Sequence, residues 1–173
     1  SAQTTWIVGF RVKFGTIAGT TIYRIADAGT VQFSMVLNAD GTLSVVRSTG
    51  TALTNGTSTF TLLTGVWYFI ECKVTISNSI GANTCKVRVN GADIINVATG
   101  QDTAATANTT ANAFDFGNIT SGNLGTTDWC DLYVCDGTGS VNNDFLGDCR
   151  IAVLSPSAAG NQTDWTPNTG ANC

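Results

Sequence analysis

The sequence predicts an all-β protein made of two packed antiparallel sheets. Apolar residues recur at every second position over many short stretches, as they do in half-buried strands. Turn signals separate these stretches, since the chain has 19 glycines and contains Asp-Gly and Asn-Gly steps that favour hairpins. No stretch carries apolar residues at helical spacing over more than about two turns. Short strands without helical crossovers are typical of a sandwich.

A hairpin within residues 66–97 organises the rest of the chain. One face of its first strand collects Tyr68, Ile70, Cys72, Val74 and Ile76. The return strand 85–89 alternates in the same way across the polar connection 77–84. Asn90 and Gly91 then supply the two positive φ angles that a type I′ turn needs, so a second hairpin follows at once.

Shorter alternating runs predict the remaining strands. Those before the hairpin span residues 6–14, 21–26, 31–37, 43–47 and 60–63, and those after it span 94–97, 114–116, 129–136 and 148–154. We expect a loop at residues 48–58. The Ala- and Thr-rich stretch 98–113 has no apolar periodicity, and it is either an ordered surface loop or a binding loop.

The opposite face of the central strand falls outside the core by the same alternation. It carries Trp67, Phe69, Glu71, Lys73 and Thr75. Glu71 is the only glutamate of the chain. We expect it to form a surface charge pair with Lys73, and the alternative is a catalytic acid.

Composition excludes several classes of partner. Charged residues make up 12% of the chain, and 8 Lys and Arg against 12 Asp and Glu give a net charge of −4. Such a chain has no basic surface for nucleic acid or for an anionic membrane. No apolar run approaches the ~20 residues of a membrane helix. The 173 residues suit a single domain, and a start in a strand without Met leads us to expect a segment of a longer chain.

The six cysteines do not form a metal motif. Cys130, Cys135 and Cys149 are irregularly spaced, and the chain has no His to complete a zinc site. Cys72 and Cys85 lie at equal distances from the midpoint of the hairpin, so we expect them to be cross-strand neighbours. They are either bonded or packed as free thiols. In a reducing compartment most thiols should be free, with this pair as the exception.

Catalytic groups are sparse. The absence of histidine excludes Ser-His-Asp and Cys-His nucleophiles. No strand carries two or three carboxylates on one face, as a glycosidase pair would need. From the residues alone we expect a protein that is not an enzyme.

One group of oxygen-bearing side chains is a candidate calcium site. The alternative is that these side chains satisfy turn backbone groups. The group consists of Asp136, Asn142, Asn143, Asp144 and Asp148. We expect no other cofactor.

Four aromatic residues are candidates for carbohydrate binding. Sugar rings stack on aromatic faces, although each of these side chains could equally pack against protein. By strand parity the candidates are Trp67, Trp129, Tyr133 and Trp165.

Three passages resemble known proteins. GVWYFIECKV and CKVRVNGADI resemble the core strands of laminin-G and concanavalin A-like lectin domains. WCDLYVCDGTG resembles their late strand, with Cys130 where the first aspartate of that strand often stands. Residues 131–170 resemble the C-terminal part of concanavalin A-like proteins of tailed bacteriophages. The resemblance implies a two-sheet antiparallel jelly-roll sandwich of the concanavalin A-like, laminin-G-like type.

The phage-like passage also implies a function. It is similar to virion structural proteins, which implies a capsid decoration or tail-associated adhesion module on the virion surface. Its partners would be other virion proteins or copies of itself, and host-surface glycans. The alternative is a secreted, extracellular carbohydrate-binding module. A third interpretation is a glycosidase remnant, although the glutamate-aspartate-glutamate strand of the related glycosidases is absent.

The first strand is expected to lie at an unpaired edge. In sandwiches of this type the terminal strands pair close to one another, and this chain ends in the irregular tail SPSAAGNQTDWTPNTGANC. Apolar area at Trp6, Phe10 and Phe14 would then be exposed, which soluble proteins normally avoid. We expect a missing segment or a neighbouring subunit to complete this edge.

Overall fold

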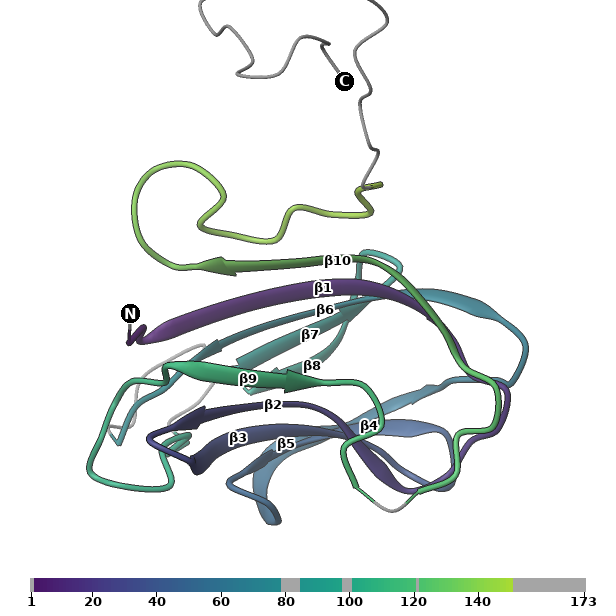
Figure 1. The fold of residues 1–173 in the computed structure, drawn as a ribbon, viewed down its shortest axis with the longest axis horizontal. Helices are drawn as coiled ribbons and strands as arrows, with labels where there is room; N and C mark the ends of the chain where they lie inside the picture. Colours follow the sequence, from purple (N-terminus) through teal and green to yellow (C-terminus); the bar gives the residue numbers. More distant parts are fainter. Residues whose placement is uncertain (1, 79–84, 98–100, 121, 151–173) are drawn as a thin grey trace, which may run out of the picture.

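The computed structural model describes residues 2–78, 85–97, 101–120 and 122–150, which form two antiparallel five-stranded sheets packed face to face (Figure 1). The first sheet has the order β10-β1-β6-β7-β8, with bounds Asp128–Asp136, Thr5–Lys13, Trp67–Thr75, Cys85–Val89 and Ala92–Val97. The second has the order β5-β4-β3-β2-β9, with bounds Thr51–Thr61, Thr42–Arg47, Thr30–Leu37, Thr20–Asp27 and Ala113–Phe116. The described residues form no helix, and therefore none that could cross a membrane. The all-β prediction is confirmed.

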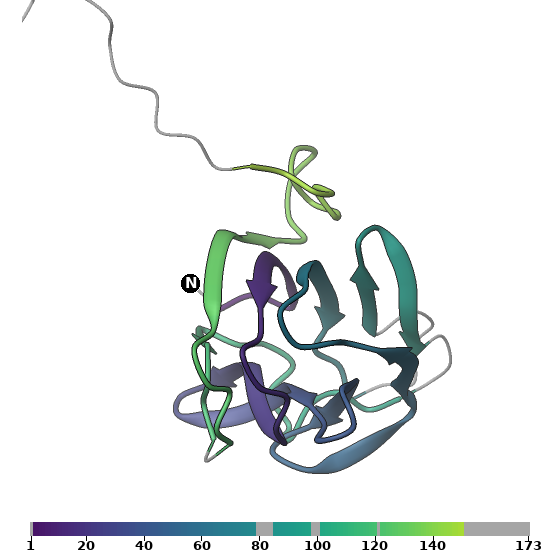
Figure 2. The ribbon, with the colours of Figure 1, turned by 90° about the vertical axis from the view of Figure 1, so that its right-hand side faces the viewer.

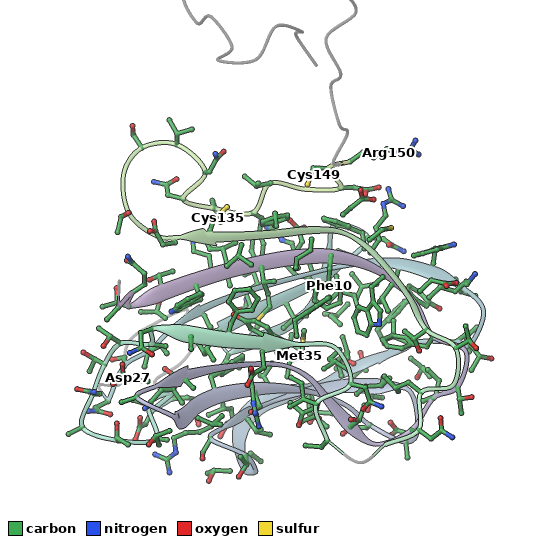
Figure 3. All side chains as sticks on the ribbon, in the orientation of Figure 1. Phe10, Asp27, Met35, Cys135, Cys149 and Arg150 are labelled. Carbon is green, nitrogen blue, oxygen red and sulfur yellow. The ribbon has the colours of Figure 1, made fainter. Side chains whose placement is uncertain are left out.

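The core lies between the two sheets. Phe10 of β1 and Met35 of β3 enter it from opposite sides (Figure 3), and both are fully buried. The Phe10 ring packs against Phe116 of β9 and Trp129 of β10, with ring centres 4.8 and 5.5 Å apart. The inner face predicted for the central strand is confirmed, since the following residues are all at most 6% exposed: Tyr68, Ile70, Cys72, Val74 and Ile76.

The first strand, β1, has hydrogen-bonded partners on both sides. It pairs with β6 over its full length and with β10 from Trp6 to Lys13. The expectation of an unpaired edge at this strand is therefore wrong, because residues 128–136 return along the sheet and cover it. The tail that we expected to leave this edge open lies outside the described residues from position 151 onward.

Two regions differ from the predicted strands. Residues 51–61 form strand β5, although we expected a loop up to residue 58. The pairing of β5 with β4 shifts register twice, and Asn55 has a φ of 58°, so the inward positions do not recur with a period of two. Of the strand predicted at 148–154, residues 148–150 are not extended strand, and the rest lies outside the described residues.

A segment after β10 covers the outer face of the first sheet. We call residues 137–150 the strap, and both ribbon views place it outside this sheet (Figures 1 and 2). Phe145 and Cys149 of the strap pack against Ile7 and Phe69, which point away from the main core. Ile7 and Phe69 are 0% and 2% exposed. The outer face therefore contains a second, smaller apolar core.

The five cysteines in the described part of the chain are free thiols. Cys72 lies opposite Val87, and Cys85 lies opposite Val74, so the two thiols are cross-strand neighbours on a diagonal. An offset of two residues keeps both side chains on the inner face, because strand side chains alternate with a period of two. Burial, followed by the contact with Cys72, raises the pKa of the Cys85 thiol well above its usual value.

Candidate functional site

The outer face of the first sheet contains a buried carboxylate. Glu71 is 1% exposed, and its Oε1 atom accepts hydrogen bonds from the Tyr133 hydroxyl at 2.6 Å and from the backbone N–H of Gly147 at 2.9 Å. A carboxylate removed from water requires such donors. The expectation of a surface ion pair between Glu71 and Lys73 is wrong, because the strap covers Glu71. The Nζ atom of Lys73 lies 3.1 Å from Oδ1 of Asp144 instead.

Tyr133 reaches Glu71 because position 9 has no side chain. Gly9 lies opposite Glu71 on one side and Tyr133 on the other. A Cβ atom at position 9 would lie 2.1 Å from Cε1 of the Tyr133 ring, so the ring rests directly on the β1 backbone. Burial, together with the hydrogen bond to Glu71, raises the pKa of Tyr133 far above its usual value. The hydroxyl therefore stays protonated and acts as a donor.

A β-bulge next to this pair brings a second carboxylate to Arg11. The β1–β10 register shifts between Gly9 and Arg11, and Asp131 has a φ of 53°. The Arg11 Nε atom lies 3.2 Å from Oδ2 of Asp131, and Nη2 lies 2.5 Å from Oδ1 of Asp148 on the strap. The guanidinium also lies 5.9 Å from the centre of the Phe69 ring. Arg11 therefore connects the sheet, the bulge and the strap.

An open hollow of about 360 Å³ lies beside Arg11. We call it the Trp67 hollow, and it is lined by Arg11, Trp67, Cys130, Asp131 and Arg150. Its walls combine an aromatic ring with side chains that donate and accept hydrogen bonds. A site that combines an aromatic surface with a few polar groups suits a small polar ligand that also has an apolar face.

The exposed ring of the hollow is held in place by its neighbours. Trp67 is 42% exposed. Lys13, directly opposite on β1, places its Nζ atom 5.2 Å from the centre of the Trp67 ring and 2.6 Å from Oδ2 of Asp128. A ring that is already oriented loses little conformational entropy when a ligand stacks on it.

The four aromatic candidates from the sequence have different environments. Trp129 packs among core aromatics, with its ring centre 4.7 Å from that of Phe116. Tyr133 is 9% exposed and lies beneath the strap. Trp165 lies outside the described residues. Of the candidates that the structure describes, Trp67 alone presents a large exposed aromatic surface.

The candidate calcium ligands are spread over the end of β10 and the strap, and their three carboxylates are engaged in separate interactions. Asp136 accepts hydrogen bonds from the Thr138 hydroxyl and N–H at 2.6 and 2.9 Å, and these bonds lower its pKa. Asp144 and Asp148 form the ion pairs given above. The full set is Asp136, Asn142, Asn143, Asp144 and Asp148. Within the described ranges no three His, Cys, Asp or Glu side chains are arranged to hold a metal, and calcium binding stays a prediction.

A second hollow, of about 440 Å³, opens beside the β4–β5 turn, and we call it the polar hollow. Gln32 of β3 is fully buried and holds the loop at residues 105–106, which lines this hollow. Its side chain accepts a hydrogen bond from the Ala105 N–H at 2.8 Å and donates one to the Thr106 hydroxyl at 3.2 Å. Arg47 and Asp102 form an ion pair across it. The lining residues, none of which is aromatic, are Arg47, Ser48, Thr51, Asn78, Asp102, Ala104, Ala105, Thr106 and Ala107.

Comparison with solved structures finds the same fold at low sequence identity. A Trypanosoma rangeli sialidase mutant with trans-sialidase activity matches with a TM-score of 0.54 and 9% identity, over 75% of this chain and 20% of that one. Domain 4 of AbnA, an extracellular GH43 arabinanase from Geobacillus stearothermophilus in complex with arabinotriose, matches with a TM-score of 0.50 and 18% identity, over 83% and 65%. A heptameric SAP-like pentraxin from Limulus polyphemus matches with a TM-score of 0.42 and 18% identity, over 77% of this chain and 64% of that one.

The likenesses to the sialidase and to the arabinanase domain establish the class of fold. The chain is a concanavalin A-like jelly-roll sandwich, as predicted, and it spans about a fifth of the length of the Trypanosoma rangeli sialidase chains that it matches. No protein-family model matches the sequence, and a comparison with curated proteins also finds no match.

The expectation that this protein is not an enzyme requires correction. The Trypanosoma rangeli sialidase and the arabinanase AbnA, each of which contains a part with this fold, are enzymes. The fold is thus compatible with activity on glycosides. The expectation rested on the absence of histidine and of paired carboxylates, and it did not consider the fold. Glu71, considered above as an alternative catalytic acid, is covered by the strap in this conformation.

Sequence reasoning did not identify the residues beneath the strap. It placed Phe69 and Glu71 outside the core, and it did not place Gly9 or Gly147 beside Glu71. One signal was present, because Ile7 and Phe69 are large apolar residues on strand faces that alternation assigns to solvent. Such residues indicate that another part of the chain covers the face.

Proposed function

We propose that this protein binds carbohydrate at the Trp67 hollow. The observation that carries the proposal is the exposed, oriented indole of Trp67 beside the ion pair of Arg11 with Asp131. A sugar ring has an apolar face that can stack on an indole and hydroxyl groups that can exchange hydrogen bonds with charged side chains. The arabinanase domain solved with arabinotriose has the same fold, which supports a role in glycan recognition.

Replacement of Trp67 with alanine tests this proposal. We expect binding on a glycan array in the wild type and a loss of at least roughly tenfold in affinity in Trp67→Ala, since an exposed aromatic anchor of this kind carries a large share of the binding free energy. Titration calorimetry with the best glycan from the array measures the change.

A matched control is Phe60→Ala. Phe60 is 39% exposed, close to the exposure of Trp67, and lies on β5 without lining the Trp67 hollow. This variant should bind with wild-type affinity. Equal losses in both variants, or full binding by Trp67→Ala, would show that the ligand does not contact this hollow.

The location that we assign is the surface of a bacteriophage virion, where the protein serves as a decoration or adhesion module. The support is the resemblance of residues 131–170 to phage-encoded proteins. Mass spectrometry of purified particles should detect the chain. Production during infection together with absence from the particles would contradict the virion location and favour a secreted carbohydrate-binding module.

A further inference from the structure

We infer that Glu71 is a positioning residue: it holds the strap against the sheet and thereby forms one wall of the Trp67 hollow. The inference about the wall rests on the proposed function, whereas the inference about the strap does not. The two parts have separate measurements below.

The strap is attached mainly at its C-terminal half. Its Gly147 N–H donates to Glu71, and its Leu146 N–H donates to the Tyr133 hydroxyl at 3.3 Å. Phe145 lies beneath the guanidinium of Arg88, whose Cζ atom is 4.1 Å from the ring centre. These contacts follow one another along residues 145–147, so this part of the strap is fixed at every residue.

Glu71 differs from the ion pairs that also attach the strap because it is buried. The ion pairs of the strap with Lys73 and Arg11 involve Asp144 and Asp148, whose side chains are 70% and 54% exposed, so water competes with these pairs. A donor that loses its acceptor in a buried site is not compensated by water. Loss of the Glu71 oxygen would leave two donors without this acceptor, the buried hydroxyl of Tyr133 and the half-buried N–H of Gly147.

The attachment point and the hollow are adjacent along the chain. Asp148 follows Gly147 directly and pairs with Arg11, and Arg150 lines the hollow three residues after Gly147. Release of Gly147 from Glu71 would therefore displace two residues that shape the hollow. Figure 3 shows Cys149 and Arg150 at this end of the strap, above the first sheet.

The cysteines provide an internal assay for strap attachment. Cys149 is partly buried where the strap meets the sheet, whereas Cys130 is exposed on β10. Cys72 and Cys85 are 0% exposed in the main core and report global unfolding. Iodoacetamide labelling of the native full chain, followed by mass spectrometry, gives the rate at each thiol.

Two neutral replacements separate the hydrogen bonds from the charge. Glu71→Gln retains an oxygen that can accept from both donors, whereas Glu71→Met retains the length without an acceptor. Burial is the main cause that raises the pKa of Cys149, and the charges of Asp131 and Glu71 add to it. Both variants remove the Glu71 charge equally. We expect Glu71→Met to label Cys149 at least roughly tenfold faster than Glu71→Gln, because the Tyr133 hydroxyl and the Gly147 N–H lose their acceptor.

Two results would overturn the role of Glu71 in holding the strap. One is equal labelling of Cys149 in both variants. The other is acceleration of Cys72 and Cys85 in parallel with Cys149, which would mean that the whole domain opens.

The wall of the hollow is tested by glycan affinity in the same two variants. Glu71→Met should bind the array-selected glycan several-fold more weakly than Glu71→Gln. Faster labelling of Cys149 with unchanged affinity would contradict the role of the strap as a wall. Absence of glycan binding by the wild type would contradict the proposed function alone, and the labelling rates would still decide the role of Glu71 in the strap.

Discussion

Replacing Gly9 with alanine is expected to reduce the free energy of unfolding by about 3 kcal/mol, because the new methyl group would overlap the Tyr133 ring. The added Cβ would lie 2.1 Å from Cε1 and 2.5 Å from Cζ of that ring. The ring cannot move away without releasing its hydrogen bond to Glu71. Urea unfolding followed by fluorescence measures the change.

The control for this substitution is Gly50→Ala. A Cβ atom at Gly50 would have no neighbour within 4 Å, so this variant should differ from the wild type by less than about 1 kcal/mol. Similar losses in the two variants would mean that Tyr133 does not rest on the β1 backbone as described.

Truncation of Phe10 to alanine is expected to have the largest effect on stability, about 4 kcal/mol. Phe10 is fully buried and packs against Phe116 and Trp129 from two other strands, so its removal leaves a cavity that spans both sheets. Denaturant unfolding measures this loss, provided that the dependence of the free energy on denaturant concentration has the same slope in both proteins.

Phe114→Ala is the matched control, since Phe114 is 38% exposed on the short edge strand β9. This variant should lower the free energy of unfolding by less than half as much as Phe10→Ala does. A larger loss at Phe114 than at Phe10 would contradict the position of the core between the two sheets.

Alternation along the sequence was sufficient to predict the inner faces of the long strands. Ile70 and Val74 are inward as expected, because residues of one strand face share one environment when that face is buried. The Asn90-Gly91 turn was also predictable from local chemistry, and both residues have positive φ, of 51° and 82°.

The outer face was less predictable because it depends on a distant segment. Glu71 is polar and lies at an outward position, so local pattern alone assigns it to solvent. Its burial results from the return of β10 beside β1 and from the strap that follows, contacts that join residues more than 60 positions apart. Most of strand β5 was missed for another reason, since Thr is its commonest residue and Asn55 interrupts its alternation.

The candidate site was predictable only in part. Trp67 was among the aromatics expected to bind carbohydrate, but strand parity could not distinguish it from Trp129, which packs in the core. The difference arises because Trp129 of β10 packs against Phe116 of β9 in the opposite sheet, whereas the ring of Trp67 points outward from the first sheet. The bulge at Asp131, which places a carboxylate beside Arg11, has no local sequence signal.

The most direct test of carbohydrate binding at the Trp67 hollow is a chemical-shift map of the ¹⁵N-labelled protein titrated with the array-selected glycan. The largest shifts should occur at the indole N–H of Trp67 and at the amides of Arg11 and Cys130. Shifts concentrated instead at Thr51, Asn78 and Ala105, around the polar hollow, would contradict this account of the protein.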